Sequence, residues 1–140
     1  MENATKHLVD RFWKAFESNN LDELDSFIDP DLHFKMPGID LNGLTALKPM
    51  LAAYITAFPD MKHEVKHWVA SGDVIVLELE VTATHTGPMA TPNGMVPATG
   101  RKLTLSSCDY IRVKNGKVVS WHGYFDNMVM MAALGLVPSS

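Results

Sequence analysis

The chain has 140 residues, of which 46% are hydrophobic and 20% are charged, and its formal net charge is −4. This length and composition predict a single globular domain, residues 1–140, rather than two domains or a disordered chain. The negative charge argues against nucleic acid or an anionic membrane as a partner. The lone Cys108 cannot form an internal disulfide, and no segment has the roughly 18 consecutive apolar residues of a membrane span. We therefore predict a cytoplasmic protein.

The first half of the chain has mainly helical periodicity. Apolar residues recur every three or four positions over 5–19, which predicts an amphipathic helix. A second, shorter helix is predicted to follow and to end at Pro30. Residues 32–36 alternate in polarity and predict a strand, and helical spacing returns over 44–58, with Pro49 expected in the first turn.

The second half has the period of β-strands. Residues 74–85 alternate, and His85 falls on their apolar face. The segment 88–100 has three prolines and two glycines and predicts a loop. In the next strand, 102–113, Asp109 falls on the inner face with leucine, isoleucine and valine.

The Asn115–Gly116 pair predicts a hairpin into the last strand, and residues 128–134 predict a final short helix. The order of elements predicts an α+β fold, in which a curved, mostly antiparallel sheet wraps around three N-terminal helices. If the last strand is regular, His122, Tyr124 and Asp126 share one face.

Four ionisable side chains are candidates for chemistry: His85, Asp109, His122 and Asp126. A histidine on an inner face is suited to general acid–base catalysis, although a hydrogen bond to a loop carbonyl near Thr86 and Gly87 would also explain His85. A carboxyl among apolar side chains must be paired, hydrogen-bonded or protonated, so Asp109 is either a proton donor or the partner of a nearby arginine. Asp126 precedes the final helix, so it is also an N-cap candidate.

Aromatic and sulfur-containing side chains are candidates for lining a ligand pocket. No pair of histidines has an evident metal-ligand context, so neither a metal nor a cofactor is expected. The pocket candidates are Trp13, Phe16, Met36, Tyr54, Phe58 and Tyr124.

Several segments, in order along the chain, resemble the SnoaL-like polyketide cyclase family of the nuclear transport factor 2-like superfamily. They are FPDM (58–61), ATHTGP (83–88), PATGR (97–101), RVKNGKVVSW (112–121) and YFDNMVMMAALGL (124–136). The resemblance implies a cone-shaped half-barrel with a pocket between sheet and helices. It also implies a catalytic carboxylate on the last strand, which corresponds either to His122 or to Asp126.

The ketosteroid isomerases of this superfamily are also similar around residues 108–120, and their oxyanion-hole aspartate matches Asp109. Their oxyanion-hole tyrosine matches Phe12, and their general-base aspartate matches Met36. Because that base and one of the two donors are missing, the resemblance argues against steroid isomerisation.

These observations lead to two hypotheses. In the first, the protein is a cofactor-independent acid–base enzyme that acts on an apolar, carbonyl-containing small molecule, as in an intramolecular aldol cyclisation. His122 or His85 is then the base, Asp109 the donor to oxygen, and Asp126 and Tyr124 orient the imidazole. In the second, it is a non-catalytic accessory protein that binds a small molecule. In either case a homodimer is expected through the outer face of the sheet.

Overall fold

The structure is a computed structural model, and it describes residues 2–91 and 94–136. The helices are α1 (Glu2–Glu17), the short 3₁₀ helix η1 (Leu21–Ser26), α2 (Leu44–Ala57) and α3 (Asn127–Ala133). The strands are β1 (Ile28–Met36), β2 (Ile39–Asn42), β3 (Lys62–Ser71), β4 (Val74–Thr84), β5 (Met89–Thr91), β6 (Gly94–Val96), β7 (Lys102–Lys114) and β8 (Lys117–Phe125).

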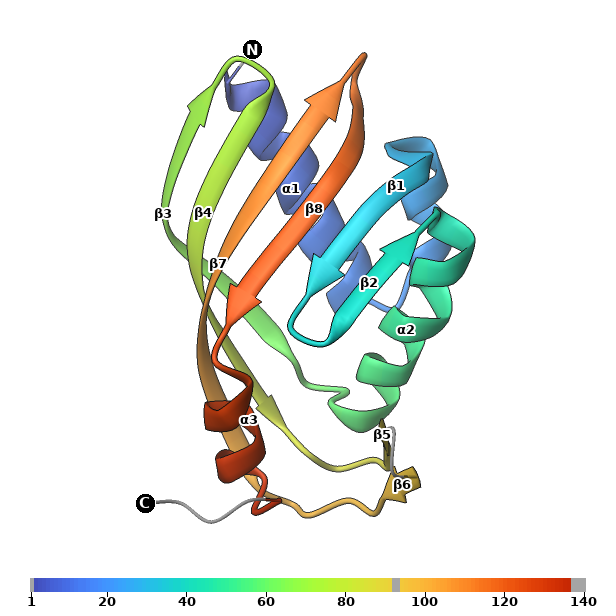
Figure 1. Cartoon of the computed structure of the whole chain (residues 1–140), viewed down its shortest axis with the longest axis vertical. Coiled ribbons are helices and arrows are strands. Elements are labelled where there is room, and N and C mark those ends of the chain that lie inside the picture. Colours follow the sequence, from blue (N-terminus) through green and yellow to red (C-terminus); the bar gives the residue numbers. More distant parts are fainter. Residues whose placement is uncertain (1, 92–93, 137–140) are drawn as a thin grey trace.

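Six strands form one curved sheet in the order β2-β1-β8-β7-β4-β3 (Figure 1). All neighbours in this sheet are antiparallel except β1 and β8, which are parallel and join the first part of the chain to the last. The strands β5 and β6 form a separate small hairpin within the predicted loop, around residues 92 and 93, which lie outside the described residues. The predicted α+β class, with its open, curved sheet, is confirmed.

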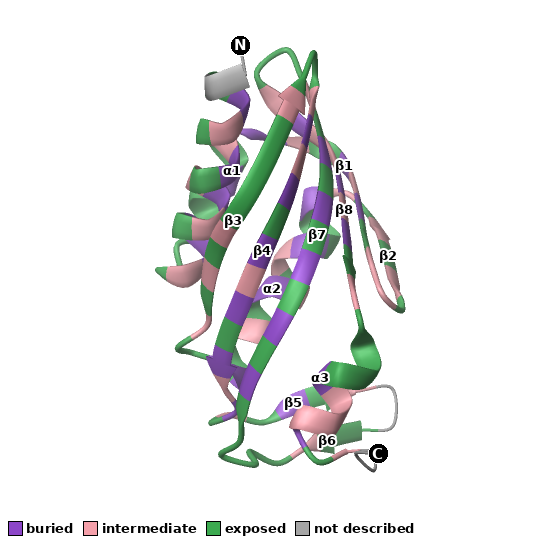
Figure 2. Ribbon diagram, turned by 90° about the vertical axis from the view of Figure 1, so that its left-hand side faces the viewer, coloured by how far each residue is buried: buried purple, intermediate pink, exposed green. Residues whose placement is uncertain are grey.

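The core lies between the concave face of the sheet and the helices. Buried and exposed residues alternate along β4 and β7 (Figure 2), because one face of each strand points to the core and the other to solvent. Phe12 on α1 is 2% exposed and packs its ring against Trp121 of β8 at 4.3 Å between centroids. Burying a side chain of this size stabilises the fold by about 1.5–3 kcal/mol.

Two details of the helices differ from the sequence prediction. The second helix ends at Ser26, and Pro30 lies inside β1, because the chain enters the sheet at Ile28, which pairs with Val118. Pro49 lies in the interior of α2, beyond the first turn, because the helix begins at Leu44. Among the described residues, no helix is long and apolar enough to cross a membrane.

Two strands change face along their length at irregular pairings. In β3 the register with β4 shifts between Val65 and His67. In β8 the register with β7 shifts so that Val118 pairs with Val113, whereas Ser120 pairs with Arg112. An extra residue at such a point reverses which side chains face the core. The shift in β8 decides which residues of the last strand reach the interior.

Candidate functional site

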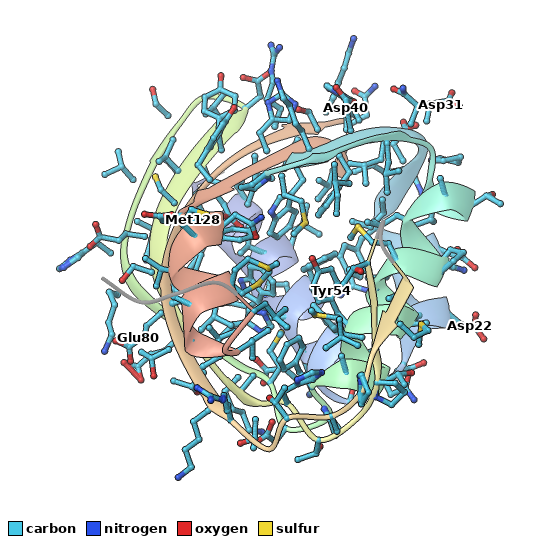
Figure 3. The ribbon with its side chains drawn as sticks, turned by 60° about the horizontal axis from the view of Figure 1, so that its bottom comes forward. Asp22, Asp31, Asp40, Tyr54, Glu80 and Met128 are labelled. Carbon is cyan, nitrogen blue, oxygen red and sulfur yellow. The ribbon has the colours of Figure 1, made fainter. Side chains whose placement is uncertain are left out.

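A cavity of about 110 Å³ lies between the concave face of the sheet and helices α1 and α2. Its wall is mostly aromatic and aliphatic, and Tyr54 extends from α2 towards the centre of the interior (Figure 3). Burial raises the pKa of the Tyr54 phenol, so the hydroxyl stays protonated. The ionisable residues other than Tyr54 that line this cavity are Asp109 and His63.

Asp109 is held on the inner face of β7, where it is 4% exposed. Trp121 donates its indole N–H to Oδ2 at 2.9 Å, and Ser107 donates its hydroxyl to Oδ1 at 2.8 Å. Burial raises the pKa of Asp109, although these two hydrogen bonds and the nearby His63 act in the opposite direction. Opposite it on β8, Gly123 leaves the carboxyl uncovered, since a Cβ there would lie 3.2 Å from Oδ1.

His63, on β3, forms a dyad with Glu17 of α1. The Nδ1 atom of His63 lies 3.0 Å from Glu17 Oε2, and the backbone N–H of His63 donates to the same oxygen at 2.8 Å. Since a carboxylate only accepts hydrogen bonds, Nδ1 carries a proton, and in the neutral ring the free lone pair is therefore on Nε2. Burial raises the pKa of Glu17, but the bonds from His63 outweigh it and the net pKa is lowered.

The His63 ring packs against two aromatic rings of α1. It stacks on Trp13 with 4.1 Å between centroids and 14° between planes, and Phe16 lies 5.3 Å away. The imidazole side chain is 4% exposed, whereas Glu17 is 22% exposed. Glu17, Trp13 and His63 also line a groove on the surface between α1 and β3, so the dyad separates the cavity from that groove.

His63 is not among the candidates predicted from the sequence, although the pattern around it contains a signal. His63 and Val65 alternate with the charged residues Lys62 and Glu64, so the histidine falls on the apolar face of its strand. This is the same argument that selected His85.

His85 is completely buried, but it does not line the cavity. Its Nδ1 lies 2.9 Å from the Thr99 hydroxyl and accepts the backbone N–H of Thr99 at 3.3 Å. The ring lies beside Phe58, 5.3 Å between centroids, and Phe58 does line the cavity. His85 is thus hydrogen-bonded to the loop, but its partner is Thr99 rather than a carbonyl near Thr86 and Gly87.

On the last strand His122 and Tyr124 share a face, as expected, but it is the outer face of the sheet. Trp121, Gly123 and Phe125 line the cavity, so His122 and Tyr124 face outward, because β8 changes face at its irregular pairing with β7. Tyr124 is 53% exposed. His122 Nε2 lies 3.1 Å from Nδ1 of His33 on the outer face of the sheet.

His122 and Asp126 both lie outside the cavity and have partners of their own. Burial and the neighbouring His33 and Lys35 lower the pKa of His122. Asp126 lies beyond the end of β8 and is the N-cap of α3, where its Oδ1 accepts the backbone N–H groups of Met128 at 2.9 Å and Val129 at 3.4 Å. Of the four ionisable residues selected from the sequence, Asp109 alone lines the cavity.

The pocket candidates are largely found together. Trp13, Phe16, Met36, Tyr54 and Phe58 all line the cavity, whereas Tyr124 does not. Whether they contact a ligand stays a prediction. Within residues 2–91 and 94–136, no cluster of three or more histidine, cysteine, aspartate or glutamate side chains is arranged to hold a metal ion.

Comparison with known proteins identifies the family. The family model of the SnoaL-like polyketide cyclases matches residues 7–134. This chain belongs to the SnoaL-like polyketide cyclase family. No curated protein matches it.

Solved structures of SnoaL-like and related proteins share the fold along nearly the whole chain. IdmH from Streptomyces antibioticus, a proposed polyketide cyclase, is 25% identical, with a TM-score of 0.77 over 94% of this chain and 98% of its own. AclR from Streptomyces galilaeus, a proposed hydroxylase, is 24% identical, with a TM-score of 0.83 over 100% of this chain and 86% of its own.

An LEH-like epoxide hydrolase from M. tuberculosis is 16% identical, with a TM-score of 0.73 over 95% of this chain and 90% of its own. The similarities place the SnoaL-like chain in the nuclear transport factor 2-like fold, as the sequence motifs implied. This is a fold that binds small molecules.

Proposed function

We propose that the protein is a cofactor-independent acid–base enzyme that acts on an apolar, carbonyl-containing small molecule. The reaction is a proton transfer of the polyketide cyclase type, such as an intramolecular aldol cyclisation. The observation that carries this proposal is that a buried carboxyl, Asp109, and a carboxylate-oriented imidazole, His63, line the same apolar cavity.

His63 is the base. Its Nε2 lone pair removes a proton from the carbon alpha to a carbonyl, and the electron pair of the broken C–H bond becomes that of the enolate. Glu17 holds the reactive tautomer and stabilises the imidazolium that forms. This assigns to His63 and Glu17 the roles that the sequence had suggested for His122 and Asp126.

Asp109 is the donor on the oxygen side. Its raised pKa keeps the carboxyl protonated to a higher pH, and a protonated carboxyl donates a hydrogen bond to a carbonyl or enolate oxygen. Ser107 and Trp121 fix its position. The reaction thus has a base and an acid on different strands, β3 and β7, facing one cavity.

The alternative of a non-catalytic binding protein is favoured by one observation: three of the four ionisable residues selected from the sequence lie outside the cavity. The dyad of His63 and Glu17 supports catalysis instead. A carboxylate that accepts from Nδ1 leaves Nε2 as the acceptor of a ring that lines the cavity, which is the arrangement that a general base requires.

The test is hydrogen exchange alpha to a carbonyl in deuterated buffer, followed by NMR with β-tetralone, a small apolar ketone. The wild type is expected to exceed the protein-free rate. His63→Gln keeps a side chain that hydrogen-bonds but removes the base, and we expect it to lower the rate at least about a hundredfold. Asp109→Asn is expected to lower it as well.

Two histidine variants complete the comparison. His67→Ala removes an exposed histidine from the same strand as His63 and is expected to keep the wild-type rate. His122→Ala compares the assignment from sequence with the one from structure. A loss of exchange in His122→Ala but not in His63→Gln would overturn the assignment of the base, and no exchange in the wild type with bound ketone would favour the binding protein.

A further inference from the structure

A second cluster of ionisable side chains lies on the outer face of the sheet, outside the cavity wall. His33 on β1 and His122 on β8 bring two ring nitrogens together, with Nδ1 of His33 3.1 Å from Nε2 of His122. Asp40 on β2 completes the cluster, since its Oδ1 lies 2.7 Å from Nε2 of His33. The three strands are neighbours in the sheet (Figure 1). The proposed function uses none of these residues.

The contact with Asp40 determines which nitrogen of His33 carries a proton. A carboxylate only accepts hydrogen bonds, so Nε2 donates to Asp40, and in the neutral ring the lone pair is on Nδ1. Nδ1 is the atom that lies beside His122. A histidine that binds a metal ion usually donates its other N–H to a carboxylate in this way. His33 thus has the hydrogen-bonding arrangement of a metal ligand.

The His122 ring provides the second nitrogen. Burial, His33 and Lys35 lower its pKa, although Asp40 acts in the opposite direction, and the neutral imidazole that results is the form that binds metal ions. Metal–nitrogen bonds of about 2.0–2.1 Å place two ligand nitrogens about 2.9 Å apart at a right angle and about 3.3 Å apart at the tetrahedral angle. The observed 3.1 Å lies between these values. An ion can therefore take the place of the proton between the two rings without moving the strands.

We propose that His33 and His122 bind one divalent transition-metal ion, with Cu²⁺ bound more tightly than Ni²⁺ or Zn²⁺. Imidazole nitrogen suits all three ions, and Cu²⁺ has the highest affinity among them for a given set of such ligands. The Ser120 hydroxyl oxygen, 3.3 Å from Nε2 of His122, adjoins the ion, and water fills the remaining positions. The ion reaches the pair from solvent, because the His33 side chain is 39% exposed.

The bound ion also links two distant parts of the chain. His33 and His122 are 89 residues apart in sequence and lie on β1 and β8, the parallel pair of the sheet. That separation is the reason why no local sequence pattern indicates the site. Because only the folded chain brings the two nitrogens together, the ion stabilises the folded state. The proposal therefore has two independent readouts, which are affinity and unfolding temperature.

The test is calorimetric titration of the protein, dialysed against EDTA and then against buffer, with CuCl₂, NiCl₂ or ZnCl₂. The wild type is expected to bind one Cu²⁺ per chain, and Ni²⁺ and Zn²⁺ more weakly. His33→Ala and His122→Ala are each expected to weaken Cu²⁺ binding at least about tenfold, since one imidazole loses the advantage of two linked ligands. The double variant is expected to bind no more weakly than either single variant, because each change already removes the shared site.

Asp40→Ala tests the carboxylate that orients His33, and we expect it to weaken Cu²⁺ binding about tenfold. Asp31→Ala is its control, since it removes an exposed carboxylate from β1 outside the cluster. His67→Ala is the control for the histidines, since it removes an exposed imidazole from β3. Both controls are expected to keep the wild-type affinity. Cu²⁺ is expected to raise the unfolding temperature of the wild type and of both controls, but not that of His33→Ala.

Two results would overturn the proposal. The first is equal Cu²⁺ affinity in the wild type, His33→Ala and His122→Ala, which would show that the ion binds elsewhere on the chain. The second is the absence of saturable binding to the wild type at millimolar Cu²⁺, which would show that the two rings only bond to each other. Both readouts are independent of turnover, so the proposal stands or falls separately from the proposed function.

Discussion

Asp109 is the residue whose protonation connects stability with function. Its folded-state pKa is raised by burial, so the native state holds this proton more tightly than the unfolded chain. Stability that depends on the neutral carboxyl is complete below the unfolded pKa of about 3.9. It is lost as the pH rises through the folded pKa, because the native state must then bury a charge.

We predict that Asp109→Asn keeps the fold and gains stability relative to wild type as the pH rises through that window. Asparagine fits the site, since its oxygen can accept from Trp121 and its NH₂ can donate to the Ser107 hydroxyl. Urea denaturation at a series of pH values measures the difference. Marked destabilisation of the variant at neutral pH, with ligand binding unchanged, would show that the carboxylate is only structural.

Glu17 shows the opposite dependence on pH. Its lowered pKa means that its contribution is present above the unfolded pKa of about 4.3 and is lost as the pH falls through the folded value. We predict that Glu17→Gln lowers the free energy of unfolding by about 1–2 kcal/mol near neutral pH.

The Glu17→Gln difference should shrink under acidic conditions, and chemical denaturation at several pH values measures it. Glu64→Gln serves as the control, because Glu64 lies on the surface beside His63 and is paired with Lys66. An effect of equal size in both variants would contradict a specific role for the dyad.

The sequence identified single polar residues well where the strand around them was regular. Asp109 lies within an uninterrupted alternation on β7, and its burial follows from counting along that strand. The burial of His85 follows in the same way from β4. The sequence could not show that His85 packs against Phe58 while Phe58 alone of the two lines the cavity, since that contact joins parts of the chain that are distant in sequence.

At the level of elements, the outward orientation of His122 has a specific physical cause. Alternation predicts a face only while each residue on one strand pairs with one on the next. The irregular pairing of Val118 and Ser120 in β8 breaks this condition. The sequence did contain one indication: the bulky apolar Trp121 precedes His122, and its face of β8 is the one that points to the core.

The contact between α2 and the loop after β4 provides a prediction about stability. Thr86 and Gly87 both donate backbone N–H groups to the carbonyl of Ala57 at 3.2 Å, so the loop lies directly on the end of the helix. A Cβ on Gly87 would lie 1.9 Å from the Thr56 carbonyl oxygen.

We predict that Gly87→Ala lowers the free energy of unfolding by about 3 kcal/mol, because backbone rather than a side chain must move. Thermal or urea unfolding measures this change. Thr86→Ala, at the exposed neighbouring position, is the control and should cost little. Equal stability of Gly87→Ala and wild type would mean that the loop can separate from α2 without losing its hydrogen bonds.

For the whole molecule, the sequence motifs established the fold but not the composition of the site. Helical periodicity followed by strand periodicity was sufficient to predict the α+β class, since in each half of the chain the local sequence pattern agrees with the elements that form there. The candidate site combines α1, β3, β7 and β8, and the proposed base, His63, is held by Glu17, which lies 46 residues earlier in the chain. Such a pairing depends on how α1 crosses the sheet, which no local pattern specifies.

The outer face of the sheet gives the last prediction, a homodimer. This face is β-rich and polar, and Tyr110 on it is 39% exposed. A stable two-fold interface requires about 800 Å² from each partner, and the long strands β4 and β7 provide a continuous surface for it. The face consists of Glu78, Glu80, Thr82, Thr84, Thr104, Ser106 and Tyr110.

Ser106→Arg is designed to separate the protomers without unfolding them. Ser106 pairs with Glu80 across strands β7 and β4, so an arginine at 106 can form an ion pair with Glu80 in its own chain. Its larger side chain would also obstruct the proposed interface. We expect the wild type to be a dimer at micromolar concentration and Ser106→Arg to be a monomer, as measured by light scattering or sedimentation. Asp22→Arg, on η1 and far from Glu80 (Figure 3), should remain dimeric. A monomeric wild type at micromolar concentration would contradict this prediction.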